Sequence, residues 1–289
     1  MWKEVVRAAG SYAFDHVLVR LEMDPIITVN QEERWIDVPV RIGESRNVVR
    51  VQGTGTTENP EFVVSSKNDE EKDLLLHRIQ DLFQWDVDLD QIKQHFRKTN
   101  LSTLFNDYPG TPIVKDFHLY DCLMKVIIHQ QLNMKFAYTL SSRFVQTFGE
   151  LVDGVWFYPT PERVARLEYE QLRELQFSQR KAEYVIDTSR KIADGELDLA
   201  QLSTLTDDEA MKELTKIRGI GPWTVENWLM FGLGRTDLYP KADIGVQNAL
   251  KRYFQMDRKP TKEEMVEMSD DWDPYKSYAS ITLWRSIEG

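Results

Sequence analysis

The stretch LTKIRGIGPWTVENWLMFGLGRTDLYPKADIGVQNAL, residues 214–250, decides the fold prediction. It contains the end of one helical pattern, EAMKELTKI, and a second pattern, PWTVENWLMF, joined by a few residues that include Gly219 and Gly221. Glycines spaced two apart allow the positive φ angles of a tight turn and let another backbone come close. Pro222 suits the first position of the second helix, whose free N–H groups and positive dipole end can bind a phosphate. We therefore predict a helical hairpin over residues 207–232 with a phosphate site at its turn.

A carboxylate, Asp243, follows the hairpin after the turn Tyr239-Pro240, where the next helical pattern, IGVQNAL, begins. On its own, the G-x-G spacing favours a plain helical hairpin whose glycines serve only close packing. On its own, an Asp at a helix start favours an N-cap worth about 1 kcal/mol. The hairpin, the proline turn and the carboxylate in one stretch favour a functional site over both of these interpretations.

The residues I-R-G-I-G-P-W-T-V-E-N, followed by L-G-R-T-D-L-Y-P-K-A-D-I-G-V, resemble the helix-hairpin-helix DNA glycosylases nearly position by position. This resemblance implies that Asp243 is the catalytic carboxylate. It also implies that the hairpin holds a monovalent cation, Na⁺ or K⁺, against a DNA phosphate through the backbone carbonyls of Thr215, Ile217 and Ile220. The expected DNA contacts on and beside the hairpin are Lys216, Arg218, Gly219, Ile220, Gly221, Trp223 and Thr224.

A second stretch, IIHQQLNMKFAYTLSSRF at residues 127–144, resembles the helix that opens the same domain in this family. There a turn bearing glutamine fills the gap that an extruded nucleotide leaves in the duplex. Gln130, Gln131 and Leu132 are the candidates for this wedge, and the sequence does not choose among them. Without the resemblance, ordinary helix surface would explain the two glutamines equally well. The stretch FSQRKAEYVIDTSRKI, residues 177–192, also fits the family pattern.

The residue just after the hairpin turn bears on the mechanism that the resemblance implies. Family members with lyase activity carry a Lys there that attacks the sugar, and an indole cannot perform this role of an amine. This chain has Trp223 in that place, so we expect a monofunctional enzyme that uses water as its nucleophile. Lys241 is a formal alternative amine, but a phosphate contact or a solvated side chain is the favoured interpretation.

Cysteine content selects among the branches of the family. The single Cys122 cannot supply the four thiolates of an iron–sulfur cluster, which removes the cluster-bearing branches. It stands in the apolar segment LYDCLMKVII, which predicts a buried thiol. The chain is most similar to the 3-methyladenine DNA glycosylase II type, which acts on alkylated purines such as 3-methyladenine and 7-methylguanine in flipped nucleotides and leaves an abasic site.

An aromatic pocket would suit alkylated purines, because they carry positive charge and electron-rich ring faces attract cations. Trp223 and Trp284 match pocket positions of this branch, and we expect Tyr239 and Tyr278 to add to the wall. Trp228 and Trp272 could also do so, but core packing is the favoured interpretation for both. Asn227 stands where the branch often has a Tyr, so the pocket is expected to be roomier or more polar.

Alternative functions remain open from the sequence. Another lesion, such as 8-oxoguanine, a deaminated purine or a mispaired base, would use the same hairpin and the same Asp. A non-catalytic DNA-binding protein would use the hairpin only as a phosphate clamp, although a clamp has no use for an Asp after Tyr-Pro. A sugar- or nucleotide-processing enzyme would need a phosphate loop, a metal triad or paired carboxylates, none of which the sequence contains.

Composition and charge agree with an ordinary soluble globular protein of 289 residues, 42% hydrophobic and 29% charged. No apolar run could span a membrane and no signal peptide is evident, so a cytoplasmic protein is expected, nucleoid-associated in a bacterium.

The net charge of −11 argues against broad electrostatic capture of DNA. However, the acidic clusters at 68–73, 86–91 and 263–273 lie away from the hairpin. We expect a monomer that binds double-stranded DNA with a damaged base. The five histidines show no zinc-ligand spacing.

The chain outside the hairpin predicts an α+β fold in two domains, 1–110 and 111–289. Strand-like runs, separated by turn residues, predict an antiparallel sheet; they are HVLVRLEM, RWIDVPVRIG, RNVVRVQG and EFVVSS. A covering helix follows, with one apolar face formed by Leu74, Leu75, Ile79, Leu82 and Phe83. A short helix over DQIKQHFRK and a linker at 106–113 come next, and the remainder is helical, as in an all-helical glycosylase domain. The N-terminal layout is similar to the extra domain of the 3-methyladenine and 8-oxoguanine glycosylase branches.

Overall fold

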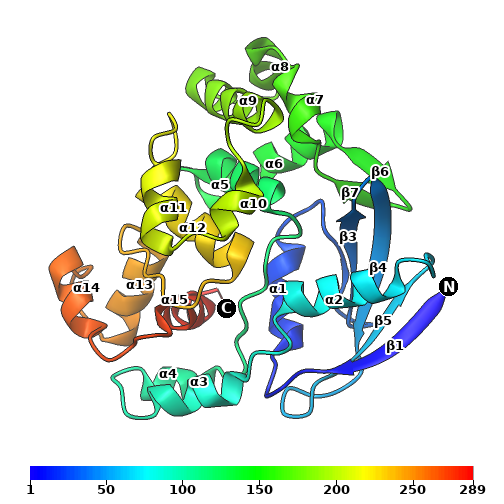
Figure 1. Ribbon diagram of the computed structural model, residues 1–289. Helices are drawn as coiled ribbons and strands as arrows, with labels where there is room; N and C mark the ends of the chain where they lie inside the picture. Colours follow the sequence, from blue (N-terminus) through cyan, green and yellow to red (C-terminus); the bar gives the residue numbers. More distant parts are fainter. Residues whose placement is uncertain (289) are drawn as a thin grey trace.

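The computed structural model describes residues 1–288 and confirms the α+β fold, with a sheet at the N-terminus and helices after it (Figure 1). Five antiparallel strands form the sheet in the order β1-β5-β4-β3-β2. Their bounds are β1 (Trp2–Arg7), β2 (Thr28–Asn30), β3 (Trp35–Ile42), β4 (Ser45–Gly53) and β5 (Glu61–Ser66). The pairs Ile36–Val51 and Val38–Val49 bury β-branched side chains on one face of β3 and β4.

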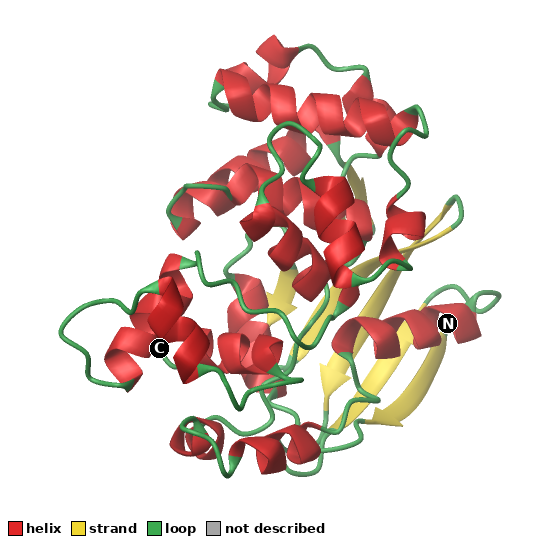
Figure 2. Ribbon diagram, turned by 60° about the vertical axis from the view of Figure 1, so that its left-hand side comes forward, coloured by secondary structure: helices red, strands yellow, loops and turns green. Residues whose placement is uncertain are grey.

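Four helices accompany the sheet, namely α1 (Phe14–Glu22), α2 (Lys72–Phe83), α3 (Leu89–Phe96) and α4 (Ser102–Asp107). Figure 2 shows the sheet at one end of the molecule with helices beside and above it. The strand prediction for HVLVRLEM was wrong, because residues 14–22 form α1. Phe14, Val17 and Leu18 are buried at helical spacing while Val19 is 47% exposed, so the burial follows the helical period. The prediction that Leu74 belongs to the apolar face of α2 was also wrong. Leu74 is 56% exposed, while the other four residues predicted for that face are buried.

The chain then forms a helical part that includes one small hairpin, β6 (Glu150–Val152) and β7 (Val155–Phe157). Its helices are α5 (Leu119–His129), α6 (Met134–Phe148), α7 (Pro161–Ala165), α8 (Tyr169–Glu174), α9 (Gln179–Ala193), α10 (Leu199–Ser203), α11 (Asp207–Leu214) and α12 (Pro222–Leu233). Thr160 and Ser178 cap α7 and α9 through their side chains, which explains where the two helices start.

The last three helices, α13 (Ile244–Tyr253), α14 (Lys262–Met268) and α15 (Lys276–Arg285), do not belong to the core of the helical part. Val246, Leu250 and Ile281 share a hydrophobic core with the sheet and α1–α4, whereas α5–α12 form a second core. In Figure 1 these helices, orange to red, lie near α3 and α4. The division at residue 110 remains a prediction, but the first core joins chain segments from both sides of it.

Residues of both cores line one cleft, which contains the candidate active site described below. Phe231 and Trp284 pack against both of them, so the two aromatic rings lie at the junction. Cys122, Trp228 and Trp272 are fully buried in the cores, as predicted. Within residues 1–288, no helix has the length and apolar character needed to cross a membrane.

Candidate active site

Asp243 caps α13 and is held by three N–H donors from three places in the chain. Its Oδ1 accepts the backbone N–H of Val246 at 2.9 Å and the indole N–H of Trp284 at 3.0 Å. Its Oδ2 accepts the indole N–H of Trp223 at 3.1 Å. Since the donors come from α12, α13 and α15, the carboxylate has a fixed orientation. Trp223 and Trp284, predicted as pocket residues, therefore also position the carboxylate.

Gly245 makes this arrangement possible, and its role was not predicted from the sequence. A Cβ at this position would lie 2.7 Å from Trp284 Nε1 and 2.9 Å from Asp243 Oδ1. Only a glycine lets the indole approach the carboxylate across the first turn of α13. The signal was present in the motif A-D-I-G-V, but its reason is a contact between residues 39 positions apart, Gly245 and Trp284, which no local pattern reveals.

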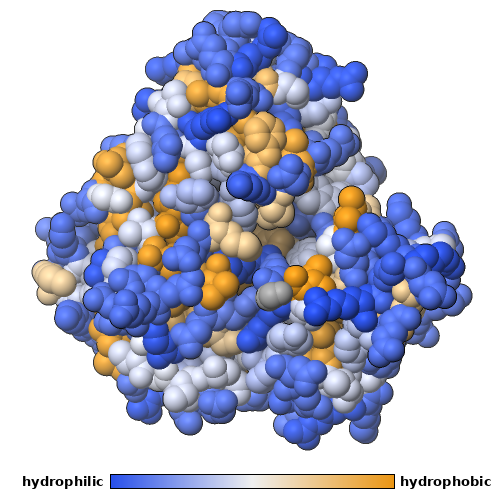
Figure 3. Space-filling model, turned by 180° about the vertical axis from the view of Figure 1, so that it is seen from behind, coloured by the Kyte–Doolittle hydropathy of each residue, from blue (hydrophilic) through white to orange (hydrophobic). Residues whose placement is uncertain are grey.

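A cleft of about 1270 Å³ opens beside Asp243. Figure 3 shows a face of the molecule that is hollowed between its upper and lower parts, with hydrophobic residues gathered around the hollow. Both indoles line the cleft together with Phe231, whose ring stacks on Trp284 at a centroid distance of 5.9 Å. Asn227 also lines it, but its amide donates to the Trp223 carbonyl at 2.7 Å.

The prediction that Tyr239 and Tyr278 form part of the pocket wall was wrong. Their exposed fractions are 7% and 1%, both belong to the core shared with the sheet, and neither lines the cleft. Tyr239 instead packs edge-on against Trp272 at a centroid distance of 5.2 Å. The turn Tyr239-Pro240 thus anchors the chain before Asp243 and does not line the cleft.

The two hairpin glycines have different physical roles. Gly219 has a φ of +92°, and a Cβ there would lie 2.3 Å from the ring of Tyr184. Gly221 has an ordinary φ of −107°, and a Cβ there would meet no atom of residues 1–288 within 4 Å. Gly219 is therefore required by the turn itself, while Gly221 leaves open space in front of α12, at its N-cap.

The first turn of α12 presents free backbone donors at this open space. No side chain caps the helix, and in residues 1–288 the N–H groups of Trp223 and Thr224 find no hydrogen-bond acceptor. Ile220 is 5% exposed and Thr224 is 2% exposed. The predicted contribution of these two residues to a DNA site is therefore limited to their backbone groups.

The turn between α5 and α6 separates the three wedge candidates. The Gln130 amide donates to the carbonyl of Gly219 at 2.8 Å and to the Thr224 hydroxyl at 2.7 Å, so it braces the hairpin from inside. Gln131 is exposed and has a φ of +57°, which places it at the tip of the turn. Leu132 is half-buried and packs against the second core.

Lys181, another residue without a predicted role, holds the same turn. Its ammonium donates to the carbonyls of Ile127 and Gln130 at 3.1 and 2.8 Å, at the C-terminal end of α5 where a positive charge is favourable. Burial lowers the pKa of Lys181 to about 8. The turn is thus held by a cation on one side and by the hairpin on the other.

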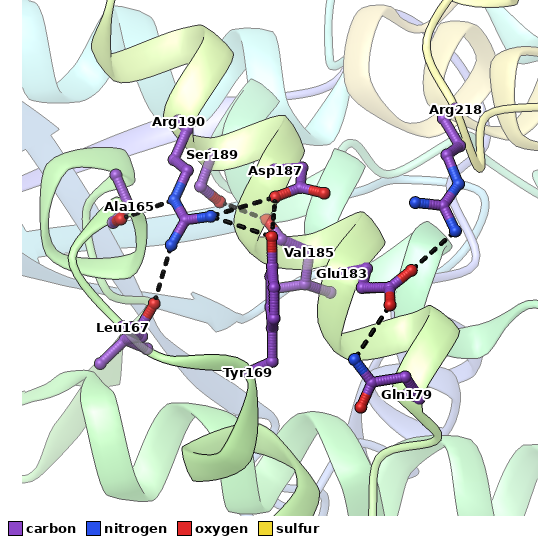
Figure 4. Close-up of polar contacts among 10 residues, drawn as sticks. All are labelled: Ala165, Leu167, Tyr169, Gln179, Glu183, Val185, Asp187, Ser189, Arg190 and Arg218. Atoms are coloured by element: carbon purple, nitrogen blue, oxygen red, sulfur yellow. Dashed lines mark hydrogen bonds and ion pairs between the residues drawn. The ribbon is translucent and has the colours of Figure 1, made fainter.

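The two predicted cationic contacts are exposed and paired with carboxylates. Lys216 donates to Glu213 at 2.6 Å. Arg218 donates to Glu183 at 2.7 Å (Figure 4). Their side chains are 59% and 68% exposed. Because both cations are more than half exposed, solvent weakens these two ion pairs.

Glu226 on α12 is a titratable group near the site that the sequence analysis did not single out. Burial raises the pKa of Glu226 to about 7, and the nearby charge of Asp243 adds to the shift. Lys241 and Lys262 act in the opposite direction. The chain therefore carries a second carboxyl beside Asp243 that changes its charge near neutral pH.

Together the fold and the site define a class: a helix-hairpin-helix protein whose carboxylate lies in an aromatic cleft. The family model of the HhH-GPD superfamily of base excision DNA repair proteins matches residues 124–274. The chain is 54% identical to YfjP of Bacillus subtilis, provisionally named a DNA-3-methyladenine glycosylase, over 100% of both chains. It is 32% identical to the DNA-3-methyladenine glycosylase of the same organism, over 89% of this chain and 87% of that protein.

Solved structures agree with this class. A 3-methyladenine DNA glycosylase of Archaeoglobus fulgidus has the same fold, with a TM-score of 0.85 at 21% identity over 99% of this chain and 97% of that one. Mag1 of Schizosaccharomyces pombe, solved in complex with abasic DNA, matches 69% of this chain and 97% of its own with a TM-score of 0.63 at 25% identity. The chain belongs to the HhH-GPD superfamily and is a DNA glycosylase.

Proposed function

We propose that this glycosylase releases alkylated purines of the 3-methyladenine and 7-methylguanine type from double-stranded DNA and leaves an abasic site. The observation that carries the proposal is the carboxylate of Asp243, held by the Trp223 and Trp284 indoles at the side of an aromatic cleft. The names of the Bacillus relatives support the choice of alkylated purines. The family description and the DNA complex of Mag1 support DNA as the partner.

Asp243 acts on the sugar of the extruded nucleotide. As the bond between C1′ and the base breaks, its electron pair leaves with the base and positive charge develops on the sugar. The fixed carboxylate stabilises this charge and orients the attacking water. Oδ2 accepts one N–H whereas Oδ1 accepts two, so Oδ2 has the freer lone pairs for water or sugar.

Water is the nucleophile in this proposal, because the two lysines among the described residues that line the cleft, Lys115 and Lys125, are ion-paired with Asp81 and Asp116. Trp223 takes the position of the lyase Lys, and its N–H is committed to Asp243. Lys241 is absent from the lining of the cleft. Lys125 does line it, but it is ion-paired with Asp116. Burial acts to lower the pKa of Lys125, but Asp116, Asp24 and other nearby groups together raise it, so the amine stays protonated.

The hairpin turn binds a phosphate of the DNA backbone through the free N–H groups of α12. The carbonyls of Thr215, Ile217 and Ile220 suit a monovalent cation, since carbonyl oxygens replace the hydration shell of such ions. Ile217 accepts only the N–H of Ile220 at 3.0 Å, and the carbonyls of Thr215 and Ile220 accept none from the described residues. A bound cation would add positive charge next to the phosphate without any need for a basic protein surface.

The wedge of this proposal is Gln131. It is the exposed residue at the tip of the turn, whereas Gln130 and Leu132 are engaged inside the protein. Lys181 and Gln130 hold the turn in place, so the Gln131 side chain can enter the duplex without loss of the local fold.

The test compares wild type with Asp243→Asn on duplexes that contain one 7-methylguanine or 3-methyladenine. We expect loss of base release with retained DNA binding, because the amide keeps the shape but removes the charge. Asn is also a good N-cap, so the free energy of unfolding should change by less than about 1 kcal/mol. Near-normal turnover by the Asn variant would contradict the mechanism, and release of only 8-oxoguanine by wild type would contradict the substrate class.

A further inference from the structure

We propose that Arg20 of α1 contacts the extruded base and stabilises the electron density that the base gains as it leaves. This proposal rests on the proposed function. The Arg20 guanidinium would extend the range of the enzyme to neutral purines with an acceptor edge, which leave as anions. This assigns a role to the N-terminal domain, because α1 forms one wall of the cleft beside Asp243.

Arg20 lies in the wall of the cleft, close to the aromatic rings beside Asp243. The buried residues Phe14, Val17 and Leu18 anchor α1, and His16 and Arg20, four residues apart, both line the cleft from it. The Arg20 guanidinium carbon lies 5.3 Å from the ring centroid of Phe231 and 5.7 Å from that of Trp284. Trp284 in turn donates to Asp243, so the cation and the carboxylate contact the same indole.

The donors of Arg20 are not used inside the described part of the protein. Nowhere in residues 1–288 does its guanidinium make a hydrogen bond, and its Nη1 is buried without a partner. Its counter-ion, Glu288, lies 3.7 Å away, beyond hydrogen-bond distance. His16 Nε2 is likewise buried without a hydrogen bond, and burial, with Arg285 and Arg20 nearby, lowers the pKa of His16 to about 3, so that it is neutral.

The positive charge of Arg20 also changes which bases the aromatic wall favours. Arg20 already occupies the place over Phe231 and Trp284 where a cationic base would find its cation–π contact. The wall is therefore less favourable for a permanently cationic base than its aromatic content indicates. An arginine fork fits the acceptor atoms of a purine edge, as it does the O6 and N7 of guanine in duplex DNA.

Cationic and neutral purines are released by the same bond changes but differ in the charge of the leaving base. The C1′–N9 bond breaks with its electron pair going to the base, a water oxygen bonds to C1′, and the water loses one proton. A cationic 7-methylguanine leaves as a neutral base and the proton goes to solvent. A neutral hypoxanthine leaves as an anion that then takes up a proton. Arg20 at the base and Asp243 at the sugar stabilise the separated charges from opposite sides, and this help matters most for the anion.

The experiment measures single-turnover base release from matched duplexes with one 7-methylguanine or one hypoxanthine, for wild type and Arg20→Gln. We expect Arg20→Gln to lower release of hypoxanthine by about tenfold or more, in line with the loss of one preorganised donor. Release of 7-methylguanine should fall by less than about threefold, because its leaving group needs no anion stabilisation.

The Glu288→Gln variant is the matched control. It removes the counter-ion of Arg20 but keeps the guanidinium in the cleft, so hypoxanthine release should be retained. If Glu288→Gln reproduces the loss seen in Arg20→Gln, Arg20 has only a structural role and the proposal is wrong. Thermal unfolding of each variant shows whether the fold is intact, and Arg20→Lys, which keeps the charge but not the fork, should restore part of the hypoxanthine activity.

The failures of the two proposals are distinguishable. If wild type releases neither base, the proposed function fails. If wild type releases 7-methylguanine but no hypoxanthine, or if Arg20→Gln lowers both rates equally, the proposed function stands and the role of Arg20 is overturned.

Discussion

Asp243 combines two roles that usually belong to different residues. It caps α13 through Val246, and it presents a carboxylate to the cleft with the help of two indoles. The N-cap explanation and the catalytic explanation of this residue are therefore compatible, because the cap uses one oxygen and leaves the other oriented by Trp223. A short N-cap side chain has few rotamers, which makes it a rigid place for a charge that must meet a sugar.

Gly245 provides the first residue-scale prediction. Gly245→Ala places a methyl group 2.7 Å from Trp284 Nε1 and 2.9 Å from Asp243 Oδ1, so the indole must move away from the carboxylate. We expect base release to fall roughly tenfold or more, since small displacements of catalytic groups are costly. Single-turnover rates on a 7-methylguanine duplex measure this. Asn248→Ala, at an exposed position of the same helix, should have no effect, and an unchanged rate in Gly245→Ala would show that the contact does not matter.

Glu226 provides a prediction of pH dependence. Burial raises its pKa from 4.5 to about 7, so the folded protein binds this proton more tightly than the unfolded chain does. The contribution of Glu226 to the free energy of unfolding is therefore greatest below pH 4.5 and is lost as the pH rises to about 7. The Glu226→Gln variant cannot ionise and should gain about 1 kcal/mol over wild type between roughly pH 5 and 8, after allowance for solvent screening.

Urea unfolding at several pH values measures this gain. The exposed Glu267→Gln serves as the control and should follow wild type at each pH. An advantage of Glu226→Gln that does not grow with pH would contradict the assignment.

At the scale of elements, the two hairpin glycines predict opposite behaviour for the same substitution. Gly219→Ala forces a Cβ against Tyr184 at a φ of +92°, so it should destabilise the fold by about 2 kcal/mol or more. Gly221→Ala meets no protein atom and should change stability by less than about 1 kcal/mol, since its φ is ordinary. It should nevertheless weaken DNA binding, because the methyl group fills the space in front of α12. Urea unfolding and fluorescence anisotropy on undamaged duplex separate the effects. Equal DNA affinity of Gly221→Ala and wild type would argue against a phosphate at this turn.

The turn between α5 and α6 predicts a similar separation for its two glutamines. Gln130→Ala loses two hydrogen bonds to the hairpin, which should cost about 1–2 kcal/mol of stability. Gln131→Ala should leave stability unchanged but slow base release from a fully paired duplex, because nothing then fills the vacated stack. A fluorescent adenine analogue beside the lesion reports the extrusion. The reverse pattern, with Gln130→Ala stable and defective in extrusion, would assign the wedge to Gln130.

The α1 segment shows why the type of a secondary-structure element was harder to predict than the residues of the site. The order H-V-L-V-R-L is compatible with strand alternation and with a helical stripe, and the first core selects the helix by burying Val17 and Leu18 together. The starts of α7, α9 and α12 were predictable because each depends on its own cap or on Pro at the first position.

At the scale of the whole molecule, an acidic protein of net charge −11 binds DNA through a few backbone donors and a local cation site in this proposal. Only about one to three phosphates should then be neutralised, so a plot of log affinity against log salt should have a slope between about −1 and −3. Anisotropy titrations in KCl from about 50 to 200 mM on one short duplex measure it. A slope of about −6 or steeper would require a basic surface, and the model of a backbone clamp would then be wrong.

The sequence by itself determined the hairpin, the carboxylate, the helix caps and the membership in a glycosylase class, because each depends on residues that are close together in the chain. Only the tertiary structure decided the environment of Asp243. The two indoles, Gly245 and Arg20 meet there from α12, α13, α15 and α1, segments far apart in the sequence. The tertiary structure also shows that Tyr239 and Tyr278 lie outside the pocket, because both rings pack in a core shared by the sheet and the last helices. Burial and contact between distant segments depend on how whole helices pack, and no local period encodes that packing.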